Sequence, residues 1–327
     1  MVRAHILTPV SAEPYNFITG RRRDLNVSSS SYMHQFFQQH PSVMNTLGRM
    51  LMKAHLIYLD YPVNPTPRYG YGNPLHGRLL ALIEENADSY EQMLSTFLDY
   101  SDFLLKIPAH PPSASYRGPY WCNGYIPALD TVSLYCLLAT LNPQRYFEIG
   151  SGHSTRFARQ AITDHGLATR ITSIDPHPRS DIDSICDEIL RVPLEALDMT
   201  KFEELEEGDV LFVDNGHRVF MNNGPTVFFL DALPRVASGV NLGFHDVFLP
   251  YDYPPEWERL YYSEQYLLAV FLLFASKRYF VQLPAYHVSK SEELFKILDP
   301  LWTSANFIGV ETHGASFWLK LRSPLQE

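Results

Sequence analysis

The fold of this chain is decided by the stretch Phe147-Glu148-Ile149-Gly150-Ser151-Gly152-His153-Ser154-Thr155. It joins a short apolar segment, 145–149, to a segment with helical spacing of apolar residues, 154–165. The two glycines allow a backbone to approach a ligand closely, and the start of a helix presents free N–H groups. The pattern predicts a ligand-binding turn between a strand and a helix, although two glycines are also typical of an ordinary tight turn.

Segments with strand and helix character alternate from residue 130 to residue 321. The strand expected at 209–213 is almost entirely apolar, as a parallel strand covered on both faces should be. This order predicts an α/β fold, a Rossmann-like, doubly wound and mostly parallel sheet. The expected strands are 145–149, 170–174, 189–192, 209–213, 239–244, 279–283 and 316–321. The expected helices are 130–141, 154–165, 180–187, 224–236, 263–276 and 291–298.

The first third of the chain has a different character. Apolar residues recur at helical spacing within 32–59, where Pro41 divides the stretch, and again within 76–107. A loop rich in proline separates them at 61–77. We therefore expect two regions, a mainly helical region over 1–115 that covers the substrate and a catalytic domain over 116–327.

A second signal for ligand binding lies at the end of the next expected strand. Asp175 follows that strand, 25 residues after Gly150. An acid at this place can accept both ribose hydroxyls of an adenosine ligand, although it can also cap a turn. A dinucleotide-binding turn would have a third glycine where this chain has Thr155, and the carboxylate of Glu148 suits a positively charged ligand better than a pyrophosphate.

These residues together resemble the class I S-adenosylmethionine-dependent methyltransferases, from about Tyr120 to the C-terminus. The blocks 208–214 and 243–250 resemble those of a bacterial subgroup that modifies sugars and secondary metabolites. The resemblance implies S-adenosylmethionine as the cofactor. The glycine loop would contact its methionine and ribose parts, and Asp175 would bind the ribose. The cofactor-binding residues so implied are Glu148, Gly150, Gly152, Ser154, Asp175, Pro176, His177 and Asp214.

Polar side chains follow the next two expected strands. Asp214 and His217 come after 209–213, and His245 and Asp246 come after 239–244. Ligands of doubly wound sheets bind beyond the carboxyl ends of the strands, so we expect these side chains in one site. Methyl transfer needs mainly proximity and orientation, but a hydroxyl acceptor also needs a base. We expect His217, with a pKa near neutral, to be that base and the other three residues to orient it or hold a metal.

The same spacing resembles the metal-dependent catechol type of O-methyltransferase. There an Asp ends the fourth strand, a Lys follows three residues later, and an Asp-Asn pair ends the fifth strand. In this chain Asp214, His217 and the pair His245-Asp246 stand in those places. The resemblance implies a divalent metal on Asp214, His245 and Asp246, and a mixed His and carboxylate set suits a transition metal better than Mg²⁺. Each residue can also be a cap or a core residue, so metal-dependent and metal-free sites both stay open.

Two aromatic segments are candidates for the acceptor pocket, 120–127 and 248–257. Aromatic faces suit a sugar ring or a planar ring, although the same residues can form a hydrophobic plug on the sheet. The candidate acceptor-binding residues are Trp121, Asn123, Tyr125 and Tyr251.

Composition limits the remaining classes of function. The 327 residues include 26 basic and 36 acidic side chains, a net charge of −10, which argues against binding to nucleic acid or to anionic membranes. The three cysteines are not spaced for zinc or a disulfide framework. The longest apolar run, 266–275, is too short to span a bilayer, and residues 1–20 lack a signal-peptide core. We expect a cytoplasmic protein, with a homodimer as one option.

The sequence therefore predicts methyl transfer from S-adenosylmethionine to a hydroxyl of a small polar acceptor, a sugar or a natural product. Several alternatives stay open: a nitrogen acceptor, a nicotinamide-dependent dehydrogenase, a metal-dependent hydrolase or oxygenase, and a binding protein without turnover.

Overall fold

The computed structural model describes residues 61–323. The two helices expected within 32–59 lie outside the described residues. Contacts divide the chain into two units, Met1–Asn64 and Pro65–Glu327, and the helices and strands below all belong to the second unit.

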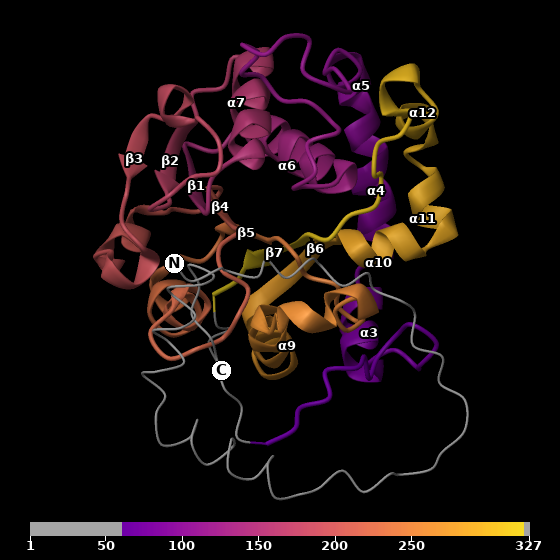
Figure 1. Cartoon of the computed structure of the whole chain (residues 1–327), viewed down its shortest axis with the longest axis vertical. Coiled ribbons are helices and arrows are strands. Elements are labelled where there is room, and N and C mark those ends of the chain that lie inside the picture. The colour runs from indigo at the N-terminus through magenta and orange to yellow at the C-terminus, as the bar shows by residue number, and fades with distance from the viewer. Residues whose placement is uncertain (1–60, 324–327) are drawn as a thin grey trace, which may run out of the picture. The chain divides into compact units, whose positions relative to one another are not determined.

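A seven-stranded sheet forms the centre of the described chain, in the order β3-β2-β1-β4-β5-β7-β6 (Figure 1). The first five strands are parallel to one another, and β7 runs antiparallel between β5 and β6. The strand order reverses between β1 and β4, the point at which such sheets bind ligands. The strands are β1 (Arg145–Ile149), β2 (Arg170–Ile174), β3 (Glu188–Leu190), β4 (Val210–Val213), β5 (Asn241–Phe244), β6 (Tyr279–Pro284) and β7 (Phe317–Leu321).

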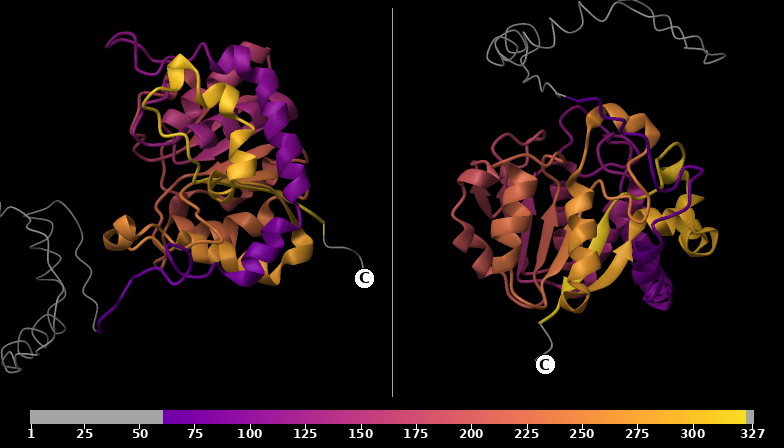
Figure 2. Two further views of the ribbon diagram at one scale, coloured as in Figure 1. Left: turned by 90° about the vertical axis from the view of Figure 1, so that its right-hand side faces the viewer. Right: turned by 90° about the horizontal axis from the view of Figure 1, so that it is seen from below.

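Helices cover both faces of the sheet, which confirms the doubly wound α/β fold. Figures 1 and 2 show α6 and α7 on one face and α3 and α9 on the other. Both faces are buried, so β4 and β5 are covered along their whole length. The α-helices are α3 (Gly77–Glu84), α4 (Ala87–Phe97), α5 (Ser101–Leu104), α6 (Ala128–Leu141), α7 (His153–His165), α8 (Gly224–Val227), α9 (Glu264–Phe274), α10 (Ala285–Lys290), α11 (Glu292–Lys296) and α12 (Asp299–Trp302).

The expected helix at 224–236 is not regular. It begins as α8, widens to a π-helical segment at Phe228–Ala232 and narrows to a 3₁₀ turn at Leu233–Arg235. Pro234 explains the change, because proline lacks an N–H and its ring clashes with the preceding turn of an α-helix. The helix expected at 180–187 is likewise reduced to a 3₁₀ turn, Asp183–Ile185. Further 3₁₀ turns lie at Leu98–Tyr100, Leu194–Ala196, Met199–Glu204, Pro255–Leu260, Ser276–Arg278 and Ala305–Phe307.

The helices expected within 76–107 pack in the same core as the sheet. Ile83, Tyr90 and Phe97 are fully or almost fully buried and belong to the hydrophobic cluster that includes the strands. Contacts place these helices in the same unit as the sheet, Pro65–Glu327, because they bury their apolar faces in the shared core, and the division at residue 115 stays a prediction. Within residues 61–323, no helix combines the length and the apolar character needed to cross a membrane.

Candidate active site

The loop after β1 is held against the loop after β4. Gly150 has a φ of +80°, and a Cβ at this position would lie 1.7 Å from the carbonyl oxygen of Asp214. Its N–H donates to the carbonyl of Ile174 at 2.9 Å. A residue with a side chain would therefore push the two loops apart, so only glycine fits at this position.

Glu148 lies underneath this loop and not in the cavity. It is fully buried and accepts hydrogen bonds from the hydroxyls of Tyr146, at 2.9 Å, and of Thr155. Burial raises the pKa of Glu148 to about 7, against the opposing effect of its hydrogen bonds. Thr155 also accepts from the N–H of Gly152 at 2.9 Å. Glu148 therefore holds the loop from below through its hydroxyl partners and does not line the cavity, so its place beside the cofactor stays a prediction. Its bond with Thr155 also explains why a threonine stands where a third glycine could have been.

Asp175 ties the end of β2 to the glycine loop. One carboxylate oxygen accepts from the N–H of Ser151 at 2.9 Å, and the other accepts from the N–H of His177 at 2.8 Å. The side chain is half-buried, and each oxygen keeps a further lone pair for a ligand hydroxyl.

A single cavity of about 520 Å³ adjoins the ends of β1, β2, β4 and β5. Seven of the eight predicted cofactor-binding residues line it, all except Glu148. They are Gly150, Gly152, Ser154, Asp175, Pro176, His177 and Asp214. The predicted catalytic residues His217, His245 and Asp246 line the same cavity.

His217 is held at both ring nitrogens by carboxylates. Its Nδ1 lies 2.9 Å from Oε2 of Glu264, a residue of α9. Its Nε2 lies 3.2 Å from Oδ2 of Asp246 and 3.5 Å from Oδ1 of Asp214. Only about 10% of the His217 side chain is exposed.

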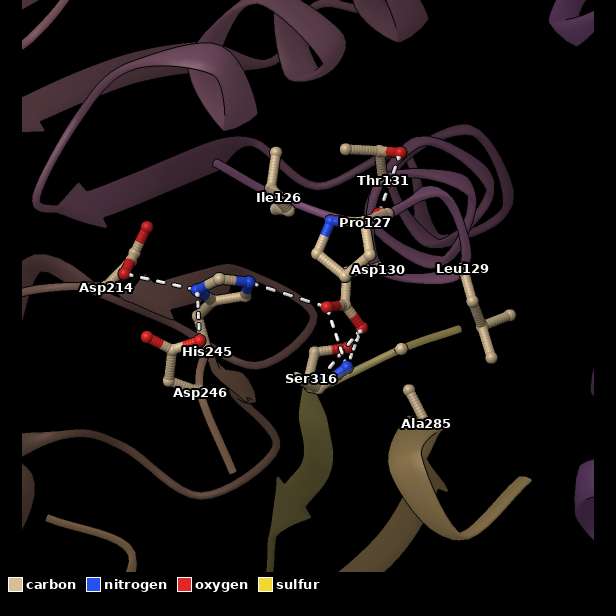
Figure 3. Close-up of polar contacts among 12 residues, drawn as sticks. Ile126, Pro127, Leu129, Asp130, Thr131, Asp214, His245, Asp246, Ala285 and Ser316 are labelled. Carbon is tan, nitrogen blue, oxygen red and sulfur yellow. Dashed lines mark hydrogen bonds and ion pairs between the residues drawn. The ribbon is translucent and has the colours of Figure 1, made fainter. Parts of the chain in front are cut away.

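His245 is surrounded in the same way (Figure 3). Its Nδ1 lies 3.3 Å from Oδ1 of Asp214 and 3.5 Å from Oδ1 of Asp246, and its Nε2 lies 3.4 Å from Oδ2 of Asp130. Asp130 is fully buried in α6, and its carboxylate also accepts the N–H groups of Ala315 and Ser316 at 2.8–2.9 Å. The result is a cluster of two imidazoles and four carboxylates in which each imidazole sits between acids.

The cluster changes the charge states of its members. Burial opposes the charged form of His217, but hydrogen bonds to Asp214 and Glu264 and the charge of Asp246 outweigh it and raise its pKa to about 10. The pKa of His245 is raised in the same way, against burial, by the charges of Asp246 and Asp214. Burial raises the pKa of Asp246. The expected near-neutral pKa of His217 is thus wrong: three carboxylates keep the imidazole protonated at pH 7.

The sequence did not single out Asp130 or Glu264. Asp130 is a carboxylate within an almost wholly apolar helix, residues 128–138, and Glu264 begins the apolar run of α9. A buried acid is almost always paired, so a lone acid in an apolar helix is a signal for a buried partner. That signal cannot tell which partner, because the partner comes from a distant part of the chain.

The cluster does not fit a metal ion. A histidine that ligates a metal must be neutral and must offer a free nitrogen lone pair. Both nitrogens of His217 and of His245 already face carboxylates. In residues 61–323 no group of three or more His, Cys, Asp or Glu side chains is arranged to hold an ion. The metal set of Asp214, His245 and Asp246 is therefore not supported.

The predicted acceptor-binding residues divide into two groups. Tyr125 lines the cavity and stacks on His153 with ring centroids 5.4 Å apart. Trp121 is buried instead, with its indole N–H on the carbonyl of Ile107, and Asn123 folds its amide back onto its own loop, including the N–H groups of residues 125 and 126. Tyr251 packs on other tyrosines outside the lining of the cavity. The structure thus brings Tyr125 to the cavity and gives the other three residues contacts outside its lining, and the acceptor-binding roles stay predictions.

The fold and the cavity define a class: a doubly wound α/β protein with a cofactor-type glycine loop facing an acid–histidine cluster. Comparison with known proteins agrees with this class. Residues 147–247 match the family model described as a methyltransferase domain, a segment that includes the glycine loop, Asp175 and both strand ends of the cluster. The resemblance to methyltransferases is confirmed over this segment. No curated protein matches the chain.

Solved structures with some likeness include several methyltransferases. A methyltransferase of Podospora anserina with bound SAH is 15% identical, with 93% of this chain and 100% of that chain covered and a TM-score of 0.37. An O-methyltransferase of Bacillus cereus in complex with SAH is 14% identical, with 71% and 91% covered and a TM-score of 0.34. An O-methyltransferase of Streptomyces achromogenes involved in tomaymycin synthesis is 13% identical, with 76% and 98% covered and a TM-score of 0.33. These likenesses are too distant to assign a role to any residue.

Proposed function

We propose that this protein is an S-adenosylmethionine-dependent methyltransferase that methylates a hydroxyl of a small acceptor, a sugar or a natural product. The observation that carries the proposal is the shared cavity. One wall consists of the glycine loop and Asp175, and the other consists of the cavity-facing members of the acid–histidine cluster. A cofactor on the first wall and an acceptor against the second would be adjacent, as transfer between them requires.

The first wall has the features that bind such a cofactor. Gly150 and Gly152 leave the backbone open, and the first turn of α7 offers the N–H groups of His153 and Ser154 to polar atoms of the ligand. The free lone pairs of Asp175 suit the ribose hydroxyls. Pro176 and His177 would then lie toward the adenine. The cofactor, when bound here, supplies the methyl group as a good electrophile.

The second wall supplies the base. Bound here, the cofactor would supply its methyl group to the acceptor oxygen, and Nε2 of His217 would accept the proton that the hydroxyl gives up. His217 must be neutral beforehand, which its raised pKa makes infrequent at pH 7. Glu264, on Nδ1, keeps the ring oriented and stabilises the imidazolium that forms. Asp214 and Asp246 hold the Nε2 side toward the cavity.

Calorimetric titration with S-adenosylhomocysteine tests the cofactor assignment, with NAD as a parallel ligand. We expect micromolar binding of the first ligand and none of the second. Asp175→Ala should weaken binding about 10- to 100-fold, because a hydrogen bond to a charged group contributes about 1.5–3 kcal/mol. Asp175→Asn keeps the shape of the side chain and one acceptor oxygen, so its affinity for S-adenosylhomocysteine should lie between those of the wild type and Asp175→Ala.

Two results would contradict the proposal at different levels. Equal affinity of the wild type and Asp175→Ala would remove the ribose role of Asp175. Absence of S-adenosylhomocysteine binding, in protein shown to be free of copurified ligand, would remove the methyltransferase function, and binding of NAD in its place would point to a dehydrogenase.

A further inference from the structure

Three neighbouring side chains of the cavity lining differ in exposure: His217 is buried, Tyr262 is half-buried, and Arg218 is exposed at the mouth of the cavity. The ring of Tyr262 lies 4.8 Å from the ring of His217, measured between centroids. The guanidinium carbon of Arg218 lies 5.2 Å from the centroid of the same tyrosine ring. All three residues line the cavity. Tyr262 is therefore a neighbour of both the proposed base and a cation.

The tyrosine and the arginine are both held in place. Trp257 and Tyr253 pack on Tyr262, at centroid distances of 5.5 and 5.9 Å. The Nε of Arg218 donates to the carbonyl of Leu260 at 2.6 Å. That bond leaves the two terminal NH₂ groups of the guanidinium for another partner. The arginine is thus an exposed side chain with a fixed stem and an available fork.

A second arginine adds to the positive charge at this mouth. Arg179, from the loop after β2, lines the cavity and lies 5.8 Å from the centroid of the Tyr125 ring. Burial and the charge of Asp246 raise the pKa of Tyr262, and the charges of Arg218 and Arg179 act against this. Over the part of the chain that the structure describes, neither arginine has a carboxylate within 4 Å.

We propose that the methyl acceptor carries an anionic group, which Arg218 binds with help from Arg179, on a ring that packs against Tyr262 and presents its hydroxyl to His217. This proposal rests on the proposed function and names the class of its acceptor. A guanidinium fork matches a carboxylate, sulfate or phosphate through two parallel hydrogen bonds. The anion would therefore fix which end of the acceptor enters the cavity.

The test uses three acceptors that share one ring and differ in charge. These are 3,4-dihydroxybenzoate, catechol and 3,4-dihydroxybenzylamine. For binding, each is titrated into protein saturated with S-adenosylhomocysteine. For activity, each is assayed separately for methylation with S-adenosylmethionine as the donor. We expect the carboxylate to bind at least about tenfold more tightly than the neutral compound, and the amine to bind more weakly than either. Arg218→Ala should remove this preference, Arg218→Lys should keep part of it, and Arg179→Ala should reduce it less.

The matched control is Arg259→Ala. Arg259 is exposed on the neighbouring 3₁₀ turn and does not line the cavity, so its removal should leave the preference unchanged. Equal binding of the three compounds to the wild type, or binding of none of them, would overturn the proposal even where S-adenosylhomocysteine binds. A loss of S-adenosylhomocysteine affinity in Arg218→Ala would also overturn it, because the guanidinium would then hold the cofactor's own carboxylate. Failure of S-adenosylhomocysteine to bind the wild type would instead contradict the proposed function.

Discussion

The two walls of the cavity are built in different ways. The wall proposed for the cofactor, the cofactor wall, consists mainly of backbone: Gly150 lies against the carbonyl of Asp214, and Asp175 accepts a hydrogen bond from the N–H of Ser151. The wall proposed for the acceptor, the acceptor wall, consists of charged side chains from the ends of β4 and β5, and Asp130 of α6 and Glu264 of α9 hold them from outside the cavity. The first wall depends on the exact path of one loop, and the second depends on the balance of charges among distant elements. Substitutions should therefore affect them differently.

The largest effect should follow Gly150→Ala. A Cβ at this position would overlap the carbonyl of Asp214, and the positive φ adds strain of its own, so we expect a loss of at least about 3 kcal/mol in the free energy of unfolding. S-Adenosylhomocysteine binding should be lost with it. Denaturant unfolding and calorimetry measure both quantities.

Gly152→Ala is the matched control for stability. Gly152 has an extended φ of 178°, and no atom lies within 4 Å of a Cβ built there, so unfolding should change little. Equal stability of the two alanine variants would show that the cofactor wall does not depend on the backbone contact.

The next effect should follow His217→Ala, which acts on the acceptor wall alone. We expect methyl transfer to fall about 10²- to 10⁴-fold, the usual contribution of a general base, while S-adenosylhomocysteine affinity stays within about twofold. His217→Gln guards against unfolding, because it keeps an amide between the carboxylates. His313→Ala, an exposed histidine outside the cavity lining, should behave as the wild type. A parallel fall in cofactor affinity would mean that the two walls are not separate.

A smaller change is expected in the pH dependence when Glu264 becomes Gln. His217 acts only when neutral, so the rate of transfer by the wild type should rise about tenfold per pH unit above neutrality and level off near pH 10. Removing the charge of Glu264 lowers the pKa of His217, so the same rise should occur about one pH unit lower. Two results would argue against His217 as the base: a rate that stays constant between pH 7 and 10, or a rise in rate that occurs at the same pH in the wild type and in Glu264→Gln.

Melting temperatures give an independent check of the same pair. The folded-state pKa of His217 lies above its unfolded value of about 6.5. Its contribution to stability is therefore complete below about pH 6.5 and is lost as the pH rises through about 10. This loss should be smaller in Glu264→Gln.

Local features of the sequence predicted the first wall well. The strand ends at Ile149 and Ile174, the glycine loop and Asp175 are neighbours in sequence or in adjacent parallel strands, so their places follow from the fold. The resemblance implies that Glu148 contacts the ligand, but a carboxylate at a strand end can face either the cavity or the core. The choice depends on Thr155, whose hydroxyl turns back to the strand.

The second wall was predicted only in part, for a physical reason. Strand order brings His217 and His245 together, but their outer partners, Glu264 and Asp130, come from helices far away in the sequence. The near-neutral pKa expected for His217 assumed an imidazole with few charged neighbours. Aromatic residues serve a core and a binding site equally well, so the sequence could not show that Trp121, a candidate for the acceptor pocket, is buried in the core.

The contacts of Asp130 have a consequence for the order in which the protein folds. This carboxylate joins α6 to residues 315 and 316, which are 185 and 186 positions further along the chain. Pairings over such separations form late, because a long loop must close before they stabilise anything. On a ribosome, strands β1 to β5 emerge well before residue 316. The charge pattern around His245 therefore matures only after almost all of the polypeptide has been made, long after the glycine loop is able to form.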